Sequence, residues 1–119
     1  MVVHFHVAPA EPRKIKLDSI NSTAISVQWR SPADREPGGL IRGYRVYYVQ
    51  VNDNDELIGA PAMVDTLDGL KNEVTITGLQ SDTFYQFQIA AYTRKGDGER
   101  SKPRKVKTKG AGLEKRSLI

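Results

Sequence analysis

The sequence predicts an all-β protein, a seven-stranded antiparallel β-sandwich, and two observations support this fold class. Apolar residues recur at every second position in several segments, which is the period of a half-buried strand. Clusters of Gly, Pro, Asn and Asp separate those segments at short intervals, as turns do in a sandwich. The 119 residues are enough for one domain.

The first two strands are expected near residues 12–18 and 24–30. The first begins at Pro12, a position that an edge strand tolerates because its N–H groups need no partner. The second has the alternation "AISVQW", with Ser26 and Gln28 on the opposite face from its apolar residues. Those apolar residues are Ile25, Val27 and Trp29.

The third, fourth and fifth strands are expected near 41–51, 61–66 and 73–77. The third carries Tyr44, Val46 and Tyr48 on one face, and the fifth carries Val74 and Ile76. The turn signals "NDNDE" and "LDG" separate the three segments.

The last two strands are expected near 83–93 and 102–108. The sixth places Tyr85, Phe87 and Ile89 on one face, and the seventh begins near Pro103. Residues 9–110 then form the domain, and residues 1–8 and 111–119 are expected to be tails or linkers.

Composition limits the function. Without cysteine the protein has neither disulfides nor thiolate chemistry, and no apolar run is long enough to span a membrane. The net charge is +4, but residues 94–116 hold ten Lys or Arg against three acidic residues. That basic end favours polyanions as partners.

Enzymatic chemistry is not expected, and neither is a cofactor. The two histidines, His4 and His6, share one face of an extended segment, and two ligands without a third make a poor metal site. Neither can serve a Ser/His/Asp triad beside a core strand. Residues 52–56, "NDNDE", lack the glycine and closing glutamate of a calcium loop, so a solvated hairpin turn is the expected structure.

Several motifs together resemble the fibronectin type III domain, an immunoglobulin-like sandwich. "LQSDTFYQFQIAA" is similar to the pattern that surrounds the family's tyrosine corner, which places Tyr85 there with its hydroxyl bonded to backbone near Leu79. The resemblance covers about residues 9–110. The expected core includes Trp29, Tyr44, Val46, Leu79, Tyr85 and Phe87.

Within that family, "GGLIRGYRVYYV" and "AAYTRKGDGERSKP" resemble an ectodomain repeat of LAR-type receptor tyrosine phosphatases. The resemblance implies a non-catalytic, monomeric spacer and protein-interaction module in the extracellular part of a plasma-membrane receptor, with roles in adhesion, axon guidance or synapse organisation. Its partners would be neighbouring modules and cell-surface ligands, without direct membrane contact. Nucleic acid is not expected, because Trp29, Tyr44 and Tyr85 are assigned to the core and leave no platform for base stacking. One alternative is a structural repeat of an intracellular scaffold protein.

A second alternative is a glycosaminoglycan-binding module such as one for heparan sulfate. Its candidate residues are Arg104, Lys105, Lys107 and Lys109 on the last strand, where Lys105 and Lys107 share the outward face. Lysines on an outer strand also deter aggregation between sheet edges, which explains the same residues without a ligand.

Three smaller features remain. Asn21 begins the sequon Asn-Ser-Thr in an expected turn and is a candidate N-glycosylation site. Tyr47 and Tyr92 are candidates for an exposed contact patch on a sheet face. Lys95-Gly96-Asp97 resembles an integrin-binding tripeptide, but Gly96 and Gly98 favour a tight hairpin in which both glycines have positive φ.

Overall fold

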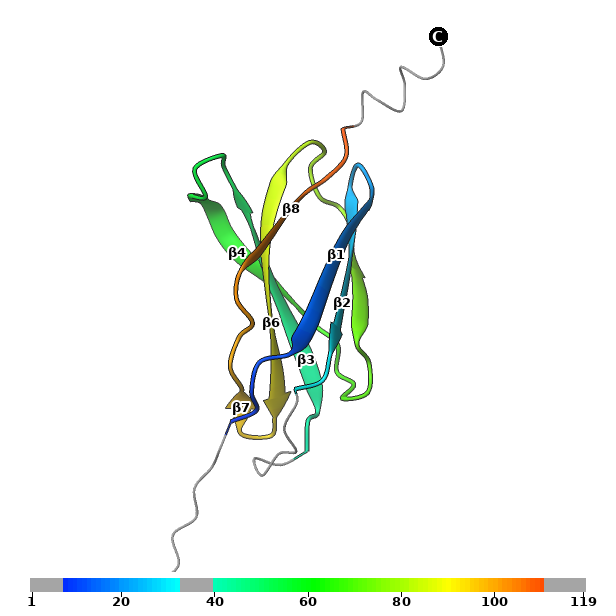
Figure 1. The fold of residues 1–119 in the computed structure, drawn as a ribbon, viewed down its shortest axis with the longest axis vertical. Coiled ribbons are helices and arrows are strands. Elements are labelled where there is room, and N and C mark those ends of the chain that lie inside the picture. Colours follow the sequence, from blue (N-terminus) through cyan, green and yellow to red (C-terminus); the bar gives the residue numbers. More distant parts are fainter. Residues whose placement is uncertain (1–7, 33–39, 111–119) are drawn as a thin grey trace, which may run out of the picture.

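The computed structural model describes residues 8–32 and 40–110, which form two antiparallel sheets packed face to face (Figure 1). The first sheet has the order β1-β2-β5, and the second has the order β4-β3-β6-β7, with β8 also paired to β6. This architecture confirms the predicted all-β sandwich. The strands are β1 (Arg13–Asn21), β2 (Ala24–Arg30), β3 (Gly43–Val51), β4 (Leu57–Asp65), β5 (Glu73–Ile76), β6 (Phe84–Thr93), β7 (Gly96–Asp97) and β8 (Arg104–Lys107).

The core lies between the two sheets and is built from the inward positions of alternating strands. Trp29 contacts Tyr44 with ring centroids 5.2 Å apart, and Tyr48 stacks on Phe87 at 5.6 Å. Such aromatic pairs add stabilisation beyond the area that they bury. All six residues expected in the core are buried: Trp29, Tyr44, Val46, Leu79, Tyr85 and Phe87.

A tyrosine corner fixes the connection into β6. The backbone N–H of Gln80 donates to the hydroxyl of Tyr85 over 2.9 Å, one residue from the predicted position at Leu79. Tyr85 itself is buried, so the hydroxyl satisfies a backbone donor at the rim of the core.

Strand β4 begins at Leu57, four residues before the predicted start at residue 61. β4 is an edge strand, which tolerates the Gly59 and Pro61 that lie within it. Because β4 is held by its pairing with β3 and not by burial, its apolar side chains are largely exposed and carry no alternating pattern. An eighth strand, the two-residue β7, was not predicted.

The described chain enters and leaves the sandwich at opposite ends, as Figure 1 shows. The entry lies beside β7, where the N–H of Glu99 donates to the carbonyl of Pro9 over 2.9 Å. Most of both predicted tails, with His4 and His6, lies outside the described residues. Residues 8–32 and 40–110 contain no helix that is long and apolar enough to cross a membrane.

Candidate functional site

The most organised polar cluster covers the outer face of the second sheet. Arg45, on β3, donates through Nη1 to Asp97 over 2.5 Å and through Nε to Asp65 over 3.3 Å. The hydroxyl of Tyr92 donates to the second oxygen of Asp65 over 2.7 Å, and Tyr47 donates to Asp97. Four strands, β3, β4, β6 and β7, are joined by this network.

Two arginines cover tyrosine rings within the same cluster. The guanidinium of Arg45 lies 4.2 Å from the ring centroid of Tyr92, and that of Arg100 lies 3.7 Å from the ring of Tyr47. Both distances are within the range of a cation–π contact. Tyr92 is only 9% exposed. The prediction that Tyr47 and Tyr92 form an exposed contact patch is therefore wrong for Tyr92.

The network shifts the titration of its members. Burial raises the pKa of Asp65, but hydrogen bonds from Tyr92, the Leu67 backbone and Arg45 outweigh burial, and the net pKa is lowered. The hydrogen bond to Asp65, followed by burial, raises the pKa of Tyr92. Burial, followed by the bond to Asp97, raises the pKa of Tyr47. In the folded protein the network therefore stabilises Asp65 as the charged carboxylate, and Tyr47 and Tyr92 as neutral phenols.

The Lys95-Gly96-Asp97 turn is part of this cluster. Its β6–β7 hairpin pairs Thr93 with Gly96, and Gly96 has a φ of 125°, as expected. Gly98 has no positive φ, contrary to expectation. Glycine is needed at position 98 for a different reason, because a Cβ at this position would lie 2.4 Å from the carbonyl oxygen of Pro9. The turn residues thus serve the packing of the hairpin.

The predicted basic row on the last strand divides between two surfaces. Lys105 and Lys107 lie together over the ring of Phe84, at 4.8 and 5.2 Å, on the outer face of the second sheet. Arg104 and the half-buried Val106 are two residues apart on β8, so they lie on the same side of the strand. Arg104 donates to the carbonyl of Ile15 on β1 over 3.2 Å.

Carboxylates offset part of the charge of this row. Lys105 lies 2.6 Å from Asp55, and Lys107 lies 3.1 Å from Asp82. Lys109 is exposed beyond the end of β8, and its backbone N–H donates to Ser19 over 3.1 Å. The structure therefore brings Lys105 and Lys107 together and separates them from Arg104.

Asn21 is the last residue of β1 and is exposed at the turn into β2. Its Oδ1 accepts from the backbone N–H of Thr23 over 2.9 Å and from the Thr23 hydroxyl over 3.3 Å. These contacts form an Asx-turn and leave the amide nitrogen directed away from those donors. Asn21 and Thr23 are both exposed in the folded domain.

The acidic turn at residues 52–56 is a hydrogen-bonded hairpin. Asn52 Oδ1 accepts from the N–H groups of Asn54 and Glu56, each over 2.9 Å, and Asn52 Nδ2 donates to Glu56 over 2.7 Å. Across the part of the chain that the structure describes, no three His, Cys, Asp or Glu side chains gather as metal ligands would. The solvated-turn interpretation agrees with this arrangement.

The two-sheet topology, the aromatic core and the tyrosine corner define the class, an immunoglobulin-like β-sandwich module. Residues 10–107 match the family model described as "Fibronectin type III domain". The chain therefore belongs to the fibronectin type III family.

Relatives refine the assignment. The chain is 46% identical over 105 residues to "Receptor-type tyrosine-protein phosphatase F" of Bos taurus, covering 88% of this chain and 6% of that protein. It is 42% identical over 103 residues to "Tyrosine-protein phosphatase Lar" of Drosophila melanogaster, covering 86% and 5%. A solved structure, "Crystal structure of the FN5 domain of Drosophila Lar", has a TM-score of 0.70 and 39% identity, over 87% of this chain and 100% of that one.

The chain thus spans only about one-twentieth of the length of the curated relatives that it matches. The matched part is a type III module homologous to repeats of LAR-type receptor phosphatases, and it is not a phosphatase catalytic domain.

Proposed function

We propose that this chain is an extracellular spacer and protein-interaction module of a LAR-type receptor that acts in adhesion and signalling. One structural observation carries the proposal: the chain enters and leaves the sandwich at opposite ends (Figure 1). Modules with that geometry, joined in series, set the reach and direction of an ectodomain. Homology to receptor-type phosphatases supports an extracellular location over an intracellular scaffold.

The module is proposed to be a monomer that contacts its neighbours and protein ligands through loops and sheet faces. On the outer face of the second sheet, the charges of Arg45, Asp65 and Asp97 pair with one another, which supports a monomer. The exposed Asn21 sequon is consistent with passage through a secretory compartment.

A surface-labelling experiment tests the location. The full-length parent receptor, with an epitope inserted at Asn54 in the β3–β4 turn, is expressed in animal cells. Intact cells are then exposed to an antibody against the epitope. We expect the epitope to be labelled without permeabilisation. Labelling only after permeabilisation would refute an extracellular module.

A domain exchange tests the spacer role. In the same receptor, this module is replaced by an unrelated type III domain, and in a second variant it is deleted. The spacer role predicts that exchange preserves cell adhesion better than deletion does, and the interaction role predicts that exchange weakens ligand binding. Loss of binding after exchange would show that this module contributes a specific ligand contact of its own.

A further inference from the structure

The three most exposed large apolar side chains of the described residues all lie at one end of the sandwich. Leu70 is 93% exposed, Leu40 is 81% exposed and Leu67 is 77% exposed, whereas no other described large apolar side chain exceeds 56%. Single exposed apolar residues scattered over a surface are ordinary, but a group of them at one place indicates a contact surface. These three residues are called the leucine end below.

Two segments that are distant in sequence bring Leu40 and Leu70 to the same place. Gly69 lies so close to the backbone of Ile41 that a Cβ at position 69 would be 2.1 Å from the Ile41 carbonyl oxygen. Leu40 directly precedes Ile41, and Leu70 directly follows Gly69. The two leucine side chains therefore project from neighbouring points of the surface.

Leu67 is held at this surface in an unusual backbone conformation. Its φ is 60°, in the left-handed region that bulky side chains rarely adopt. The N–H of Leu67 donates to Asp65 over 2.9 Å, and Asp65 in turn accepts hydrogen bonds from Arg45 and Tyr92. Backbone strain that the surrounding structure maintains in this way is concentrated at functional sites.

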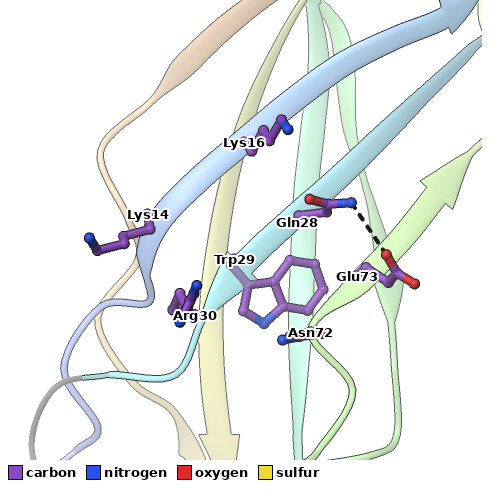
Figure 2. A pocket seen from close by; sticks show the side chains of 7 residues that line it. All are labelled: Lys14, Lys16, Gln28, Trp29, Arg30, Asn72 and Glu73. Atoms are coloured by element: carbon purple, nitrogen blue, oxygen red, sulfur yellow. Dashed lines mark hydrogen bonds between the residues drawn. The ribbon is translucent and has the colours of Figure 1, made fainter.

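The loop that carries Leu67 and Leu70, residues 66–72, is also fixed where it ends. The carbonyl of Asn72 accepts the backbone N–H of Trp29 over 3.1 Å, and the next residue, Glu73, accepts a hydrogen bond from Gln28 over 3.4 Å (Figure 2). The loop is therefore tied to β2 at two successive positions. A surface that is ordered before binding loses little conformational entropy when a partner covers it.

The chain enters the sandwich at the leucine end. Figure 1 shows the light green loop between β4 and β5 at the same end as the chain entry and the β6–β7 hairpin. Pro9 is buried there, and its carbonyl accepts the N–H of Glu99. Since residues 1–7 reach at most ~25 Å even when fully extended, a module joined to residue 1 stays tethered near this end.

We propose that the leucine end docks on the module that precedes this one in the parent receptor and makes the joint between the two modules a fixed one. The occupant is an apolar surface at the exit end of that module, which covers Leu67 and Leu70. A second copy of the chain is a weaker candidate, because a short tether holds the preceding module at an effective concentration of about 1 mM. The inference rests on the proposed spacer role, since a spacer sets direction only where its joints are fixed.

Hydroxyl-radical footprinting with mass spectrometry tests whether the leucine end is covered. The purified ectodomain of the parent receptor and the isolated 119-residue chain are oxidised under identical conditions, and oxidation rates are compared residue by residue. We expect Leu67 and Leu70 to react at least about fivefold more slowly in the ectodomain. Met63, which is exposed in the middle of the edge strand β4, should react at the same rate in both proteins.

Two outcomes of the footprint would overturn the proposal. Equal rates for Leu67 and Leu70 in the two proteins would show that no module covers them. Protection that already appears in the isolated chain and grows with its concentration would assign the surface to a second copy. Because the footprint uses unmodified protein, misfolding of a variant does not affect this result.

A charge-matched pair of variants tests whether the joint is fixed. One ectodomain variant carries Leu67→Glu and Leu70→Glu, and the control carries Ile20→Glu and Met63→Glu, which also replace two exposed apolar side chains. One spin label is placed at Asn54, in the turn between β3 and β4 at the opposite end of the sandwich (Figure 1), and another on a strand of the preceding module. Electron paramagnetic resonance then measures the distribution of distances between them.

We expect the Leu67→Glu, Leu70→Glu variant to widen this distribution at least about twofold, because two carboxylates at the joint disfavour apolar contact. The control should keep the width of the unmodified ectodomain. Equal widths for all three proteins would overturn the fixed joint. Location and spacer role are tested separately on intact cells by surface labelling and domain exchange, so unprotected leucines together with preserved adhesion after exchange would refute the docking alone.

Discussion

The guanidinium of Arg45 lies 2.5 Å from the carboxylate of Asp97, which joins β3 to the final hairpin across 52 residues of sequence. Tyr47 donates to the other oxygen of the same carboxylate. Asp97 belongs to the tripeptide that resembles an integrin ligand, yet both of its oxygens are occupied within the domain.

Asp97→Ala should lower the free energy of unfolding by about 1 kcal/mol, since the partly exposed ion pair and the bond from Tyr47 are lost together. Denaturant melts measure the change. Lys95→Ala is the matched control, because it alters the same tripeptide without touching the network, and its effect should stay within about 0.5 kcal/mol. Loss of cell adhesion by Asp97→Ala at an unchanged melting temperature would instead support a ligand tag.

Tyr85→Phe should destabilise the domain by about 1–2 kcal/mol, because the N–H of Gln80 would lose its acceptor at the rim of the core. Tyr48→Phe is a suitable control, as Tyr48 packs against the same core while no hydrogen bond from its hydroxyl is found within the described residues. Equal stability of Tyr85→Phe and the unmodified protein in urea melts would show that the corner bond contributes nothing.

Truncation of the core should be far more costly. Trp29→Ala or Leu79→Ala removes a buried side chain and leaves a cavity, with an expected loss of about 3–5 kcal/mol. Such a loss is enough to unfold a marginally stable domain. Leu70→Ala is the control, because Leu70 is 93% exposed and should tolerate truncation. Circular dichroism during thermal denaturation would separate these classes, and similar melting of all three variants would contradict the assigned core.

Stability should fall at both extremes of pH because of the Arg45 network. The net pKa of Asp65 is lowered in the folded state, so its contribution is present above the usual value of 3.8 and is lost as the pH falls below it. The raised pKa values of Tyr47 and Tyr92 contribute below pH 10.0, and that contribution is lost as the pH rises further.

Urea melts over a series of pH values check both limbs. Asp65→Asn should flatten the acidic limb, and Tyr92→Phe should flatten the alkaline limb. A pH profile of either variant that parallels the unmodified protein would show that the network does not couple to folding.

Asn21 should carry an N-linked glycan when the parent receptor is expressed in secretory cells. Glycosidase treatment is expected to increase gel mobility, and Asn21→Gln or Thr23→Ala should remove this glycan. Thr23→Ser keeps the sequon and serves as the matched control. An identical glycosidase shift with and without the sequon would exclude Asn21 as the modified residue.

The sequence by itself determined the fold and the family. Alternation along β2, β3 and β6 identified the inward face of each strand, because a strand can bury only every second side chain. The tyrosine corner followed from a local pattern around Tyr85, since the bond it predicts spans only five residues. These features depend on near neighbours in the chain, which a single sequence displays.

Only the tertiary structure decided which outward-facing side chains meet. Asp97 pairs with Arg45, and Leu40 comes to the same end as Leu70, because strand order and register bring distant segments together. The predicted basic row contains both Arg104 and Lys105, but the structure places them on different surfaces, because adjacent residues on a strand point to opposite sides. Periodicity distinguishes inside from outside, whereas contacts across the surface depend on pairing between strands that the sequence pattern does not encode.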